Sequence, residues 1–354
     1  MQPDANPVWD RLAEISECEA AMKRNARTKE PWWNPAQKNA ARNWLEKSLA
    51  ERAISLKGEL LDVQIRPWSV VLKAPSIDGD VYFKASSPSL AHEAPLTDWL
   101  ADRHPELVPE VLAAEPEQGW LILRDGGVRL RDSLDRGTLL SVWNDLLPTY
   151  ARLQESCMRE TPELLAMGVP DRRLATLPGH VARWRADLEA RSDQEGWLSQ
   201  EELGRLTGLQ PELIAVCEEL ESLGPAHTIN HGDLHDGNVL WLNRRFRIFD
   251  WGDSSLTHPF FSLRTTFVSI ENRLGWEEDD PRFNDLRRQY LGGWSSAFES
   301  ENLERAFELA RMVWSIVTAL NWEAALGTFA TPAAKEYEHV LPSLMRERME
   351  AMER

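Results

Sequence analysis

A short stretch near residue 235 holds side chains that could bind a metal ion and move a proton. It reads His231-Gly232-Asp233-Leu234-His235-Asp236-Gly237-Asn238, and Asp250 follows Asn238 after twelve residues. Asp233 and Asn238 are five residues apart in a loop that contains glycine, so both side chains can turn toward one point. Two carboxylates and an amide oxygen suit Mg²⁺, a hard cation that takes oxygen ligands.

These three side chains would suffice for much of a phosphoryl transfer. Asp233 could accept the proton of a substrate hydroxyl while Asn238 and Asp250 hold the metal on the phosphates of a nucleotide. Because this chemistry needs mainly positioning and charge neutralisation, one further cation on the phosphates would nearly complete the site.

The residues between Asn238 and Asp250 predict a hairpin that brings the two together. Strands are expected over Val239–Leu242 and Phe246–Phe249, joined by a three-residue turn at Asn243-Arg244-Arg245. Four residues out and four back would return Asp250 to the loop that carries Asn238.

The further cation is expected on a sheet that precedes the loop. Lys84 ends a predicted strand, and Glu93 begins the following helix nine residues later. Apolar and polar residues alternate before and after them, which predicts five strands, mostly antiparallel, with one inserted helix. The strands are expected over 61–65, 68–72, 81–84, 111–112 and 120–123, and the helix over about 92–103.

The rest of the chain reads as helices, with the hairpin as the one strand pair among them. A polar helix over residues 1 to about 30 and a second one over about 36–52 precede the sheet. After Gly126-Gly127, helices are expected over about 139–156, 178–190, 211–223, 285–298, 303–326 and 332–347. The sequence therefore predicts a two-lobed α+β fold with a small antiparallel five-stranded N-lobe and a larger helical C-lobe.

The motifs closely resemble those of the aminoglycoside phosphotransferase and choline kinase superfamily, whose members are relatives of protein kinases. The pattern H-G-D-L-H-x-G-N, a hairpin and then D-W-G is its catalytic and metal loop. Similar segments are V-Y-F-K for the phosphate lysine, H-E-A for its partner, and G-W-L-I-L-R-D-G-G between the lobes.

The resemblance implies a protein-kinase-like fold and a small-molecule kinase that uses ATP and Mg²⁺. It implies Asp233 as catalytic base, Asn238 and Asp250 as metal ligands, and Lys84 with Glu93 as an ion pair on the phosphates. The backbone of Leu123, Arg124 and Asp125 would meet the adenine. We expect three domains: an N-terminal helical extension over 1–58, a nucleotide-binding lobe over 59–124, and a C-lobe with the acceptor site over 125–354.

Two segments depart from the superfamily pattern. The turn between the first two strands reads Arg66-Pro67-Trp68-Ser69, where members often carry small residues in a loop that covers the phosphates. This turn has no glycine, and we expect Ser69 to contact a phosphate instead. Where many members have D-P-x-x-D-L, this chain has His258-Pro259-Phe260-Phe261-Ser262-Leu263, which we expect to change a structural anchor.

Charge limits the partners. The chain has 40 Lys and Arg against 57 Asp and Glu, a net charge of -17, and the segment after Arg124 holds -13 of it. Such a surface repels nucleic acid and anionic lipid. No leader, membrane span or paired-cysteine motif is visible, so we expect a cytoplasmic protein whose partners are a nucleotide and a small acceptor.

The same charge favours a cationic acceptor, such as an aminoglycoside, an amino sugar or a choline-like amine; a sugar is the uncharged option. Among 16 Trp, four fall in the helical part expected to bind it and are candidate acceptor contacts through cation–π attraction. They are Trp276, Trp294, Trp314 and Trp322.

Two other functions compete with the kinase. His231, Asp233 and His235 could ligate Zn²⁺ or a di-metal centre of a hydrolase, although the chain has only eight His and no second cluster. In the kinase, His231 and His235 instead support the catalytic loop. A nucleotide-binding module without catalysis is the third reading, and the presence of all four of Lys84, Asp233, Asn238 and Asp250 argues against it.

Overall fold

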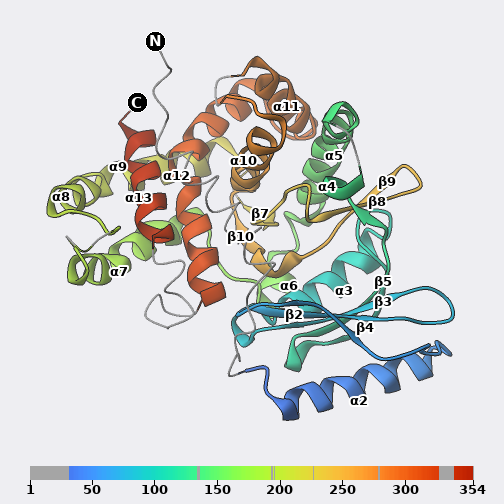
Figure 1. The fold of residues 1–354 in the computed structure, drawn as a ribbon. Helices are drawn as coiled ribbons and strands as arrows, with labels where there is room; N and C mark the ends of the chain where they lie inside the picture. The colour runs from blue at the N-terminus through green and yellow to red at the C-terminus, as the bar shows by residue number, and fades with distance from the viewer. Residues whose placement is uncertain are drawn as a thin grey trace. The chain divides into compact units, whose positions relative to one another are not determined.

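The computed structural model describes residues 32–353, apart from 134–135, 193, 195, 226, 278–279 and 327–338. The helix expected over residues 1 to about 30 lies outside this part of the chain. Two compact units are distinguished: described residues up to Ser133 together with Gly237–Gly252, and the described residues of 134–236 together with 253–354 (Figure 1).

The first unit contains the expected five-stranded antiparallel sheet. Its strands lie in the order β1-β2-β3-β5-β4, and helix α3 (Glu93–Arg103) is inserted between β3 and β4. They are β1 (Leu61–Ile65), β2 (Ser69–Ala74), β3 (Val81–Ser86), β4 (Val111–Glu115) and β5 (Trp120–Arg124). With the mainly helical second unit, this sheet confirms the predicted fold class.

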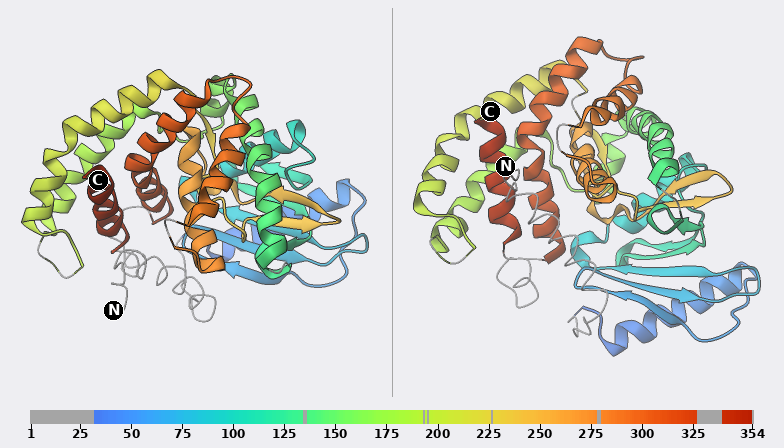
Figure 2. Two further views of the ribbon diagram at one scale, coloured as in Figure 1. Left: turned by 90° about the horizontal axis from the view of Figure 1, so that it is seen from above. Right: turned by 45° about the horizontal axis from the view of Figure 1, so that its top comes forward.

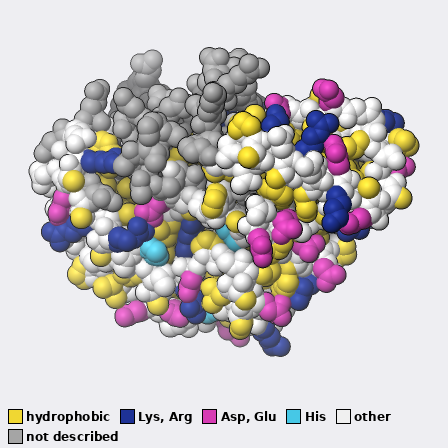
Figure 3. All heavy atoms as spheres, turned by 90° about the horizontal axis from the view of Figure 1, so that it is seen from below, with side chains coloured by type: hydrophobic (Ala, Val, Ile, Leu, Met, Phe, Trp, Pro, Cys, Tyr) yellow, Lys and Arg dark blue, Asp and Glu magenta, His cyan; other side chains and the backbone are white. Residues whose placement is uncertain are grey.

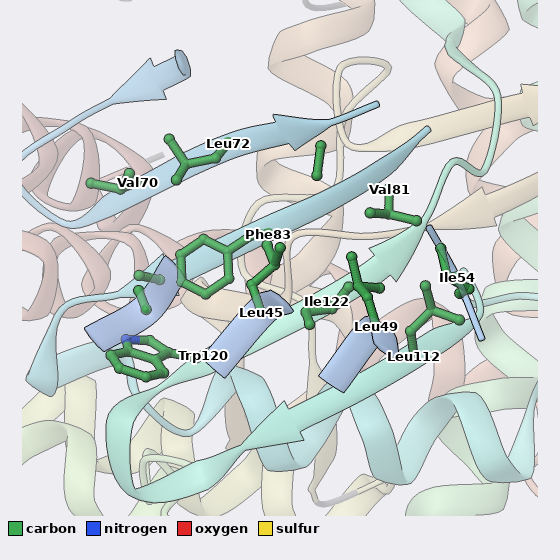
Figure 4. Packing of buried hydrophobic residues seen from close by; sticks show 13 residues of the cluster. Leu45, Leu49, Ile54, Val70, Leu72, Val81, Phe83, Leu112, Trp120 and Ile122 are labelled. Atoms are coloured by element: carbon green, nitrogen blue, oxygen red, sulfur yellow. The ribbon is translucent and has the colours of Figure 1, made fainter. Parts of the chain in front are cut away.

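One face of this sheet is covered by helix α2 (Pro35–Glu51), close to the expected 36–52. The helix begins where the Asn34 side chain accepts the amides of Ala36 and Gln37, as N-cap residues do. Its Leu45 and Leu49 are buried against alternate strand residues, among them Phe83 (Figure 4). The opposite residues of β2 and β3, including Val71 and Lys84, are thereby left for the other face.

A second, smaller sheet in the same unit holds the predicted hairpin. It consists of β6 (Val128–Arg129), β8 (Val239–Leu242) and β9 (Arg245–Ile248). The expected three-residue turn is wrong, because Leu242 pairs with Arg245 and only Asn243 and Arg244 connect the strands. Both have positive φ, 51° and 61°, as the tightest hairpin turn requires.

The second unit is mainly helical, and α12 and α13 pack along each other (Figure 2). The expected helices are present as α5 (Arg136–Cys157), α7 (Leu177–Ala190), α9 (Gln210–Leu223), α11 (Pro281–Gly292), α12 (Ser300–Leu326) and α13 (Val340–Met352). Helices that the sequence did not predict are α6 (Thr161–Ala166), α8 (Gln200–Gly208) and α10 (Ser262–Leu274), besides α4 (Leu130–Ser133) in the first unit. The 3-10 helices are η1 (Pro88–Leu90), η2 (Pro116–Gln118), η3 (Leu174–Thr176), η4 (Trp251–Asp253) and η5 (Pro259–Phe261).

Three expectations for this unit are corrected. The hairpin is not the only strand pair, because β7 (Thr228–Asn230) pairs with β10 (Ser255–Thr257). Helix α11 begins earlier than 285, since Asp280 caps it and Pro281 occupies its first turn, and it ends at the Gly292–Gly293 pair. Helix α13 begins at Val340 rather than 332, and residues 332–338 lie outside the described part.

His258 occupies a fully buried position at the start of η5. Its Nδ1 accepts the amide of Phe260 at 3.3 Å, and its ring packs on Phe260 and Phe261. His258 thus caps η5 in the segment that departs from D-P-x-x-D-L. Burial lowers the pKa of His258 to about 3, so the ring stays neutral in the folded protein.

We expect this burial to make the protein acid-sensitive. The unfolded chain binds a proton at His258 below its ordinary pKa of 6.5, whereas the folded chain does not until about pH 3. The contribution of His258 to the free energy of unfolding is therefore close to its full value at pH 7.5. It falls by about 1.4 kcal/mol between pH 7.5 and pH 5.5. In a His258→Asn variant, which keeps a cap acceptor, the free energy of unfolding measured with urea should fall by about 1.4 kcal/mol less than in the wild type over the same pH interval. An unchanged pH slope in the variant would contradict the assignment.

Among the described residues, no helix is both long and apolar enough to cross a membrane. On the face shown in Figure 3, acidic and basic side chains lie interspersed among hydrophobic and neutral ones.

Candidate functional site

Lys84 and Glu93 form a buried ion pair in the first unit. Lys84 lies in β3 and Glu93 is the first residue of α3, and the Nζ–Oε1 distance is 2.6 Å. Glu93 is only 2 % exposed, and its second carboxylate oxygen accepts the hydroxyl of Ser86 at 2.7 Å. Because both carboxylate oxygens are engaged, Glu93 holds the ammonium in one position.

Asp250 is the second carboxylate at Lys84, whose Nζ donates to its Oδ1. Burial alone lowers the pKa of Lys84, but the charges of Asp250 and Glu93 raise it more, so the ammonium stays protonated. Asp250 has a φ of +67°, a left-handed conformation that Asp tolerates better than most residues. Such backbone geometry costs energy and is common at functional sites.

The hairpin places Asn238 beside the residue that precedes Asp250. Val239 pairs with Ile248, and the amide of Phe249 donates to the carbonyl of Asn238 at 3.1 Å. The next residue, Trp251, is fully buried and donates its indole N–H to the carbonyl of Ile248. Two oxygen-bearing side chains therefore start from neighbouring backbone positions.

A pocket of about 980 Å³ lies in this unit, and most of the residues predicted to bind the nucleotide and the metal line it. Those that do are Ser69, Lys84, Leu123, Arg124, Asp125, Asn238 and Asp250. At the end of β5, the amides of Arg124 and Asp125 donate to the carbonyls of Glu110 and Asp80. These two amides are therefore engaged with the backbone of the same unit and are not available to a ligand.

The second unit holds the first part of the motif, from His231 to Asp236. Asp233 is 37 % exposed by its side chain, and its Oδ2 lies 3.3 Å from Nε2 of His235. His231 is fully buried, and its Nδ1 accepts the amide of Asp233 at 3.3 Å. The ring of His231 therefore fixes the loop, and His235 contacts the carboxylate.

Gly232 cannot be replaced without distortion. Its φ is +80°, and a Cβ atom there would lie 2.2 Å from the carbonyl oxygen of Asp253. Its own carbonyl accepts from Thr265 at 3.3 Å and from the amide of Asn321 at 3.5 Å. Asn321 in turn accepts a hydrogen bond from the buried Arg172.

The sequence did not indicate these supports. Arg172 and Asn321 are 149 residues apart and carry no motif of their own. Asp236 is held in a similar way: it is 3 % exposed, its Oδ2 lies 3.7 Å from Nε of Arg273, and its Oδ1 accepts the hydroxyl of Ser269 in α10. Asp236 stands at the variable position of the motif H-G-D-L-H-x-G-N, so the motif gives no signal for this contact.

The zinc site considered for a hydrolase does not form. In the described part of the chain, no group of three or more His, Cys, Asp or Glu is placed to hold a metal ion. With the ring of His231 turned to the amide of Asp233, the cluster His231, Asp233 and His235 lacks the required arrangement.

Two of the four candidate Trp residues are buried in packing contacts. Trp294 is fully buried against Phe260 and Phe298, and Trp276 is 8 % exposed. Trp276 already has a guanidinium, that of Arg282, 4.0 Å from its ring centroid. Trp314 and Trp322 are half-buried on α12, so they retain surface for a ligand.

A profile of the phosphotransferase enzyme family matches residues 62–299, about two thirds of the 354-residue chain. The chain belongs to this family. It is thus a phosphotransferase that acts on a hydroxyl group of a small molecule, as the sequence predicted.

Several solved structures share the fold. A macrolide 2'-phosphotransferase from Brachybacterium faecium is 18% identical, covers 82% of this chain and 98% of its own, and has a TM-score of 0.51. A choline kinase from Streptococcus pneumoniae is 10% identical, covers 86% and 99%, and has a TM-score of 0.52. A choline kinase from Cryptosporidium parvum is 13% identical, covers 80% and 88%, and has a TM-score of 0.51. Among curated proteins, no sequence matches the chain.

Proposed function

We propose that this small-molecule kinase transfers the γ-phosphate of ATP to a hydroxyl group of its acceptor with the help of Mg²⁺. The observation that carries the proposal is Lys84, held between Glu93 and Asp250 in a pocket of about 980 Å³. A fixed ammonium beside a carboxylate is the pairing that a nucleotide–metal complex needs. Pockets of this size hold small ligands.

The residues present fit a magnesium ion. Asn238 and Asp250 supply oxygen ligands from adjacent backbone positions, and Mg²⁺ prefers one or two protein carboxylates with phosphates and water. The metal would supply neutralisation of the charge on the transferred phosphate. Asp250 is 44 % exposed by its side chain and so remains accessible to a ligand while it pairs with Lys84.

Asp233 is proposed as the catalytic base. Its carboxylate accepts the hydroxyl proton of the acceptor, the acceptor oxygen bonds to the γ-phosphorus, and ADP leaves with the electrons of the broken bond. His231 holds the amide of Asp233, and His235 contacts its carboxylate, so both support the loop. The motif, in which Asp233 precedes Asn238 by five residues, supports this assignment.

The adenine is proposed to bind at the end of β5. Leu123, Arg124 and Asp125 line the pocket, and the carbonyl groups there could accept the amino group of adenine. We propose residues 59–124 as the nucleotide-binding domain, with 1–58 as a helical extension and 125–354 as the part that carries the catalytic loop and binds the acceptor.

A cationic acceptor is favoured by charge. The segment after Arg124 carries -13 of the net charge of -17, which attracts amines such as aminoglycosides, amino sugars or choline-like compounds. Trp314 and Trp322 remain candidate contacts through cation–π attraction.

Thermal unfolding with nucleotides tests the proposal. ATP with Mg²⁺ should raise the melting temperature more than ATP with a chelator, and GTP measured in parallel reports the base preference. A screen of amines and sugars for ADP release then identifies the acceptor. If neither ATP nor GTP stabilises the protein, the proposed function is wrong; an anionic acceptor would refute the charge argument alone.

We also propose a cytoplasmic location, on the expected reduced state of the thiols. Cell fractionation checks it, and recovery in a secreted fraction would contradict it.

A further inference from the structure

The turn between β1 and β2 differs from a flexible glycine-rich loop. It consists of Arg66, Pro67 and Trp68, between Ile65 at the end of β1 and Ser69 at the start of β2. The amide of Arg66 donates to the carbonyl of Ser69 at 2.8 Å, so the strands pair up to the turn. A loop that binds phosphates through its backbone needs free amides, but Pro67 has no N–H and the amide of Arg66 is already engaged.

Both inner carbonyls of this turn are tied to other parts of the first unit. The indole Nε1 of Trp32 donates to the carbonyl of Pro67 at 2.5 Å. The amide of Ser87 donates to the carbonyl of Trp68 at 2.8 Å. Because the turn is held on both sides, it is poorly suited to fold over a ligand, and anion binding there must come from side chains.

Arg66 and Ser69 offer such side chains. Arg66 is 9 % exposed and Ser69 5 %, and both line the pocket that contains Lys84 and Asp250. Val71 pairs with Lys84 across the sheet, and Ser69 lies two residues, about 7 Å, further along β2 on the same face. The turn therefore lies at the end of the pocket that continues from Lys84.

Arg66 also differs from the other cations of the pocket. Lys84 pairs with Glu93 and Asp250, while Arg124 pairs with Glu110 and Arg129 with Asp132, each at 2.7 Å. Within the described part of the chain, the guanidinium of Arg66 has no carboxylate partner. Among the four basic residues that line the pocket, Arg66 is therefore the one that forms no ion pair with a carboxylate of the described residues. A buried charge without a counterion is costly, and an anionic ligand would relieve that cost.

We propose that Arg66 binds the phosphate chain of the nucleotide, with the hydroxyl of Ser69 as a second donor. The inference rests on the proposed function and adds a phosphate-binding residue to it. The planar guanidinium can bind two phosphate oxygens at once, which a lysine cannot do. Lys84 is already compensated by two carboxylates, so Arg66 supplies the charge that distinguishes a nucleotide with several phosphates from one with few.

Binding measurements across a phosphate series test this role. Isothermal titration gives the Kd of ATP with Mg²⁺, of ADP with Mg²⁺, of AMP and of adenosine for wild type and for Arg66→Gln. We expect Arg66→Gln to raise the Kd of ATP by about tenfold or more and the Kd of adenosine by less than about twofold. The substitution removes hydrogen bonds to the charged phosphates, which ATP has and adenosine lacks. Arg66→Lys should be intermediate, since it keeps the charge but not the planar fork.

Arg42→Gln is the matched control, because Arg42 is an exposed arginine of the same unit that pairs with Glu46. It should bind all four ligands as the wild type does. If the wild type binds ATP and Arg66→Gln binds it equally well, the role of Arg66 is refuted and the proposed function stands. If the wild type binds no nucleotide, both fail. An equal loss for ATP and adenosine in both Arg66 variants would show a structural role and would also refute the inference.

Discussion

Replacing Asp233 by Asn should reduce kcat by about 10²–10⁴-fold while the Kd of ATP changes less than about twofold. Asn has nearly the shape of Asp but cannot accept the proton of the acceptor hydroxyl. The side-chain oxygen of Asn can still contact His235, which lies 3.3 Å from the carboxylate of Asp233. The hydrogen bond from the backbone amide of residue 233 to Nδ1 of His231 does not depend on the side chain, so the loop should keep its conformation. A coupled assay of ADP release with the acceptor found by screening gives kcat, and titration of ATP gives the Kd.

The matched control for this change is Asp145→Asn, at an exposed position of α5. It removes one negative charge from the same unit and should leave kcat and the Kd unchanged. If Asp233→Asn retains more than about a tenth of the wild-type kcat, Asp233 is not the base. A chain that binds ATP but shows no Asp233-dependent turnover with any acceptor would instead be a nucleotide-binding module.

Replacing Asp250 by Asn should abolish the dependence of ATP binding on Mg²⁺ and lower kcat/KM on the order of a hundredfold. The change removes the negative charge that faces both the proposed metal and the ammonium of Lys84. Asn is suited to the φ of +67° at this position, so the backbone is not strained further, as it would be with Ala. The melting temperature with ATP, measured with and without Mg²⁺, reports the metal dependence directly.

Asp62→Asn provides the comparison for this second change. Asp62 is 56 % exposed by its side chain in β1, pairs loosely with Lys38 at 3.8 Å, and should be silent in both measurements. If Asp250→Asn keeps the same Mg²⁺-dependent shift as the wild type, then Asp250 is not a metal ligand.

The sheet and its helix were predictable because they carry strong local patterns. In β2 and β3, residues such as Leu72 and Phe83 alternate with polar or pocket-facing ones, and α3 follows β3 after a short connection. The pairing of Lys84 with Glu93 was expected from their order in the chain together with the motif, and the structure places them 2.6 Å apart.

The missed elements lack such patterns. Strands β7 and β10 have three residues each, too few for a period, and their pairing connects segments about 25 residues apart. The hairpin turn was expected to have three residues, but the strand pairing continues to Leu242 and Arg245, and Asn243 and Arg244 take positive φ between them.

Contacts between distant residues at the site were equally hidden. Lys84 and Asp250 are separated by 166 residues, so nothing local to either predicts their hydrogen bond. Arg66 illustrates the opposite case: the absence of glycine in its turn was visible, but its burial in the pocket was not. The domain boundaries at 58 and 124 stay a prediction.

The covering of the sheet by α2 bears on how this enzyme can be shortened. The family profile begins at residue 62, after α2 has ended, yet Leu45 and Leu49 are fully buried against the same sheet as Phe83 and Trp120. A truncated protein that starts at the profile boundary would bare this apolar layer to water and, we expect, aggregate. The smallest piece of this unit able to fold must therefore include α2, even though the residues that define the family all follow it.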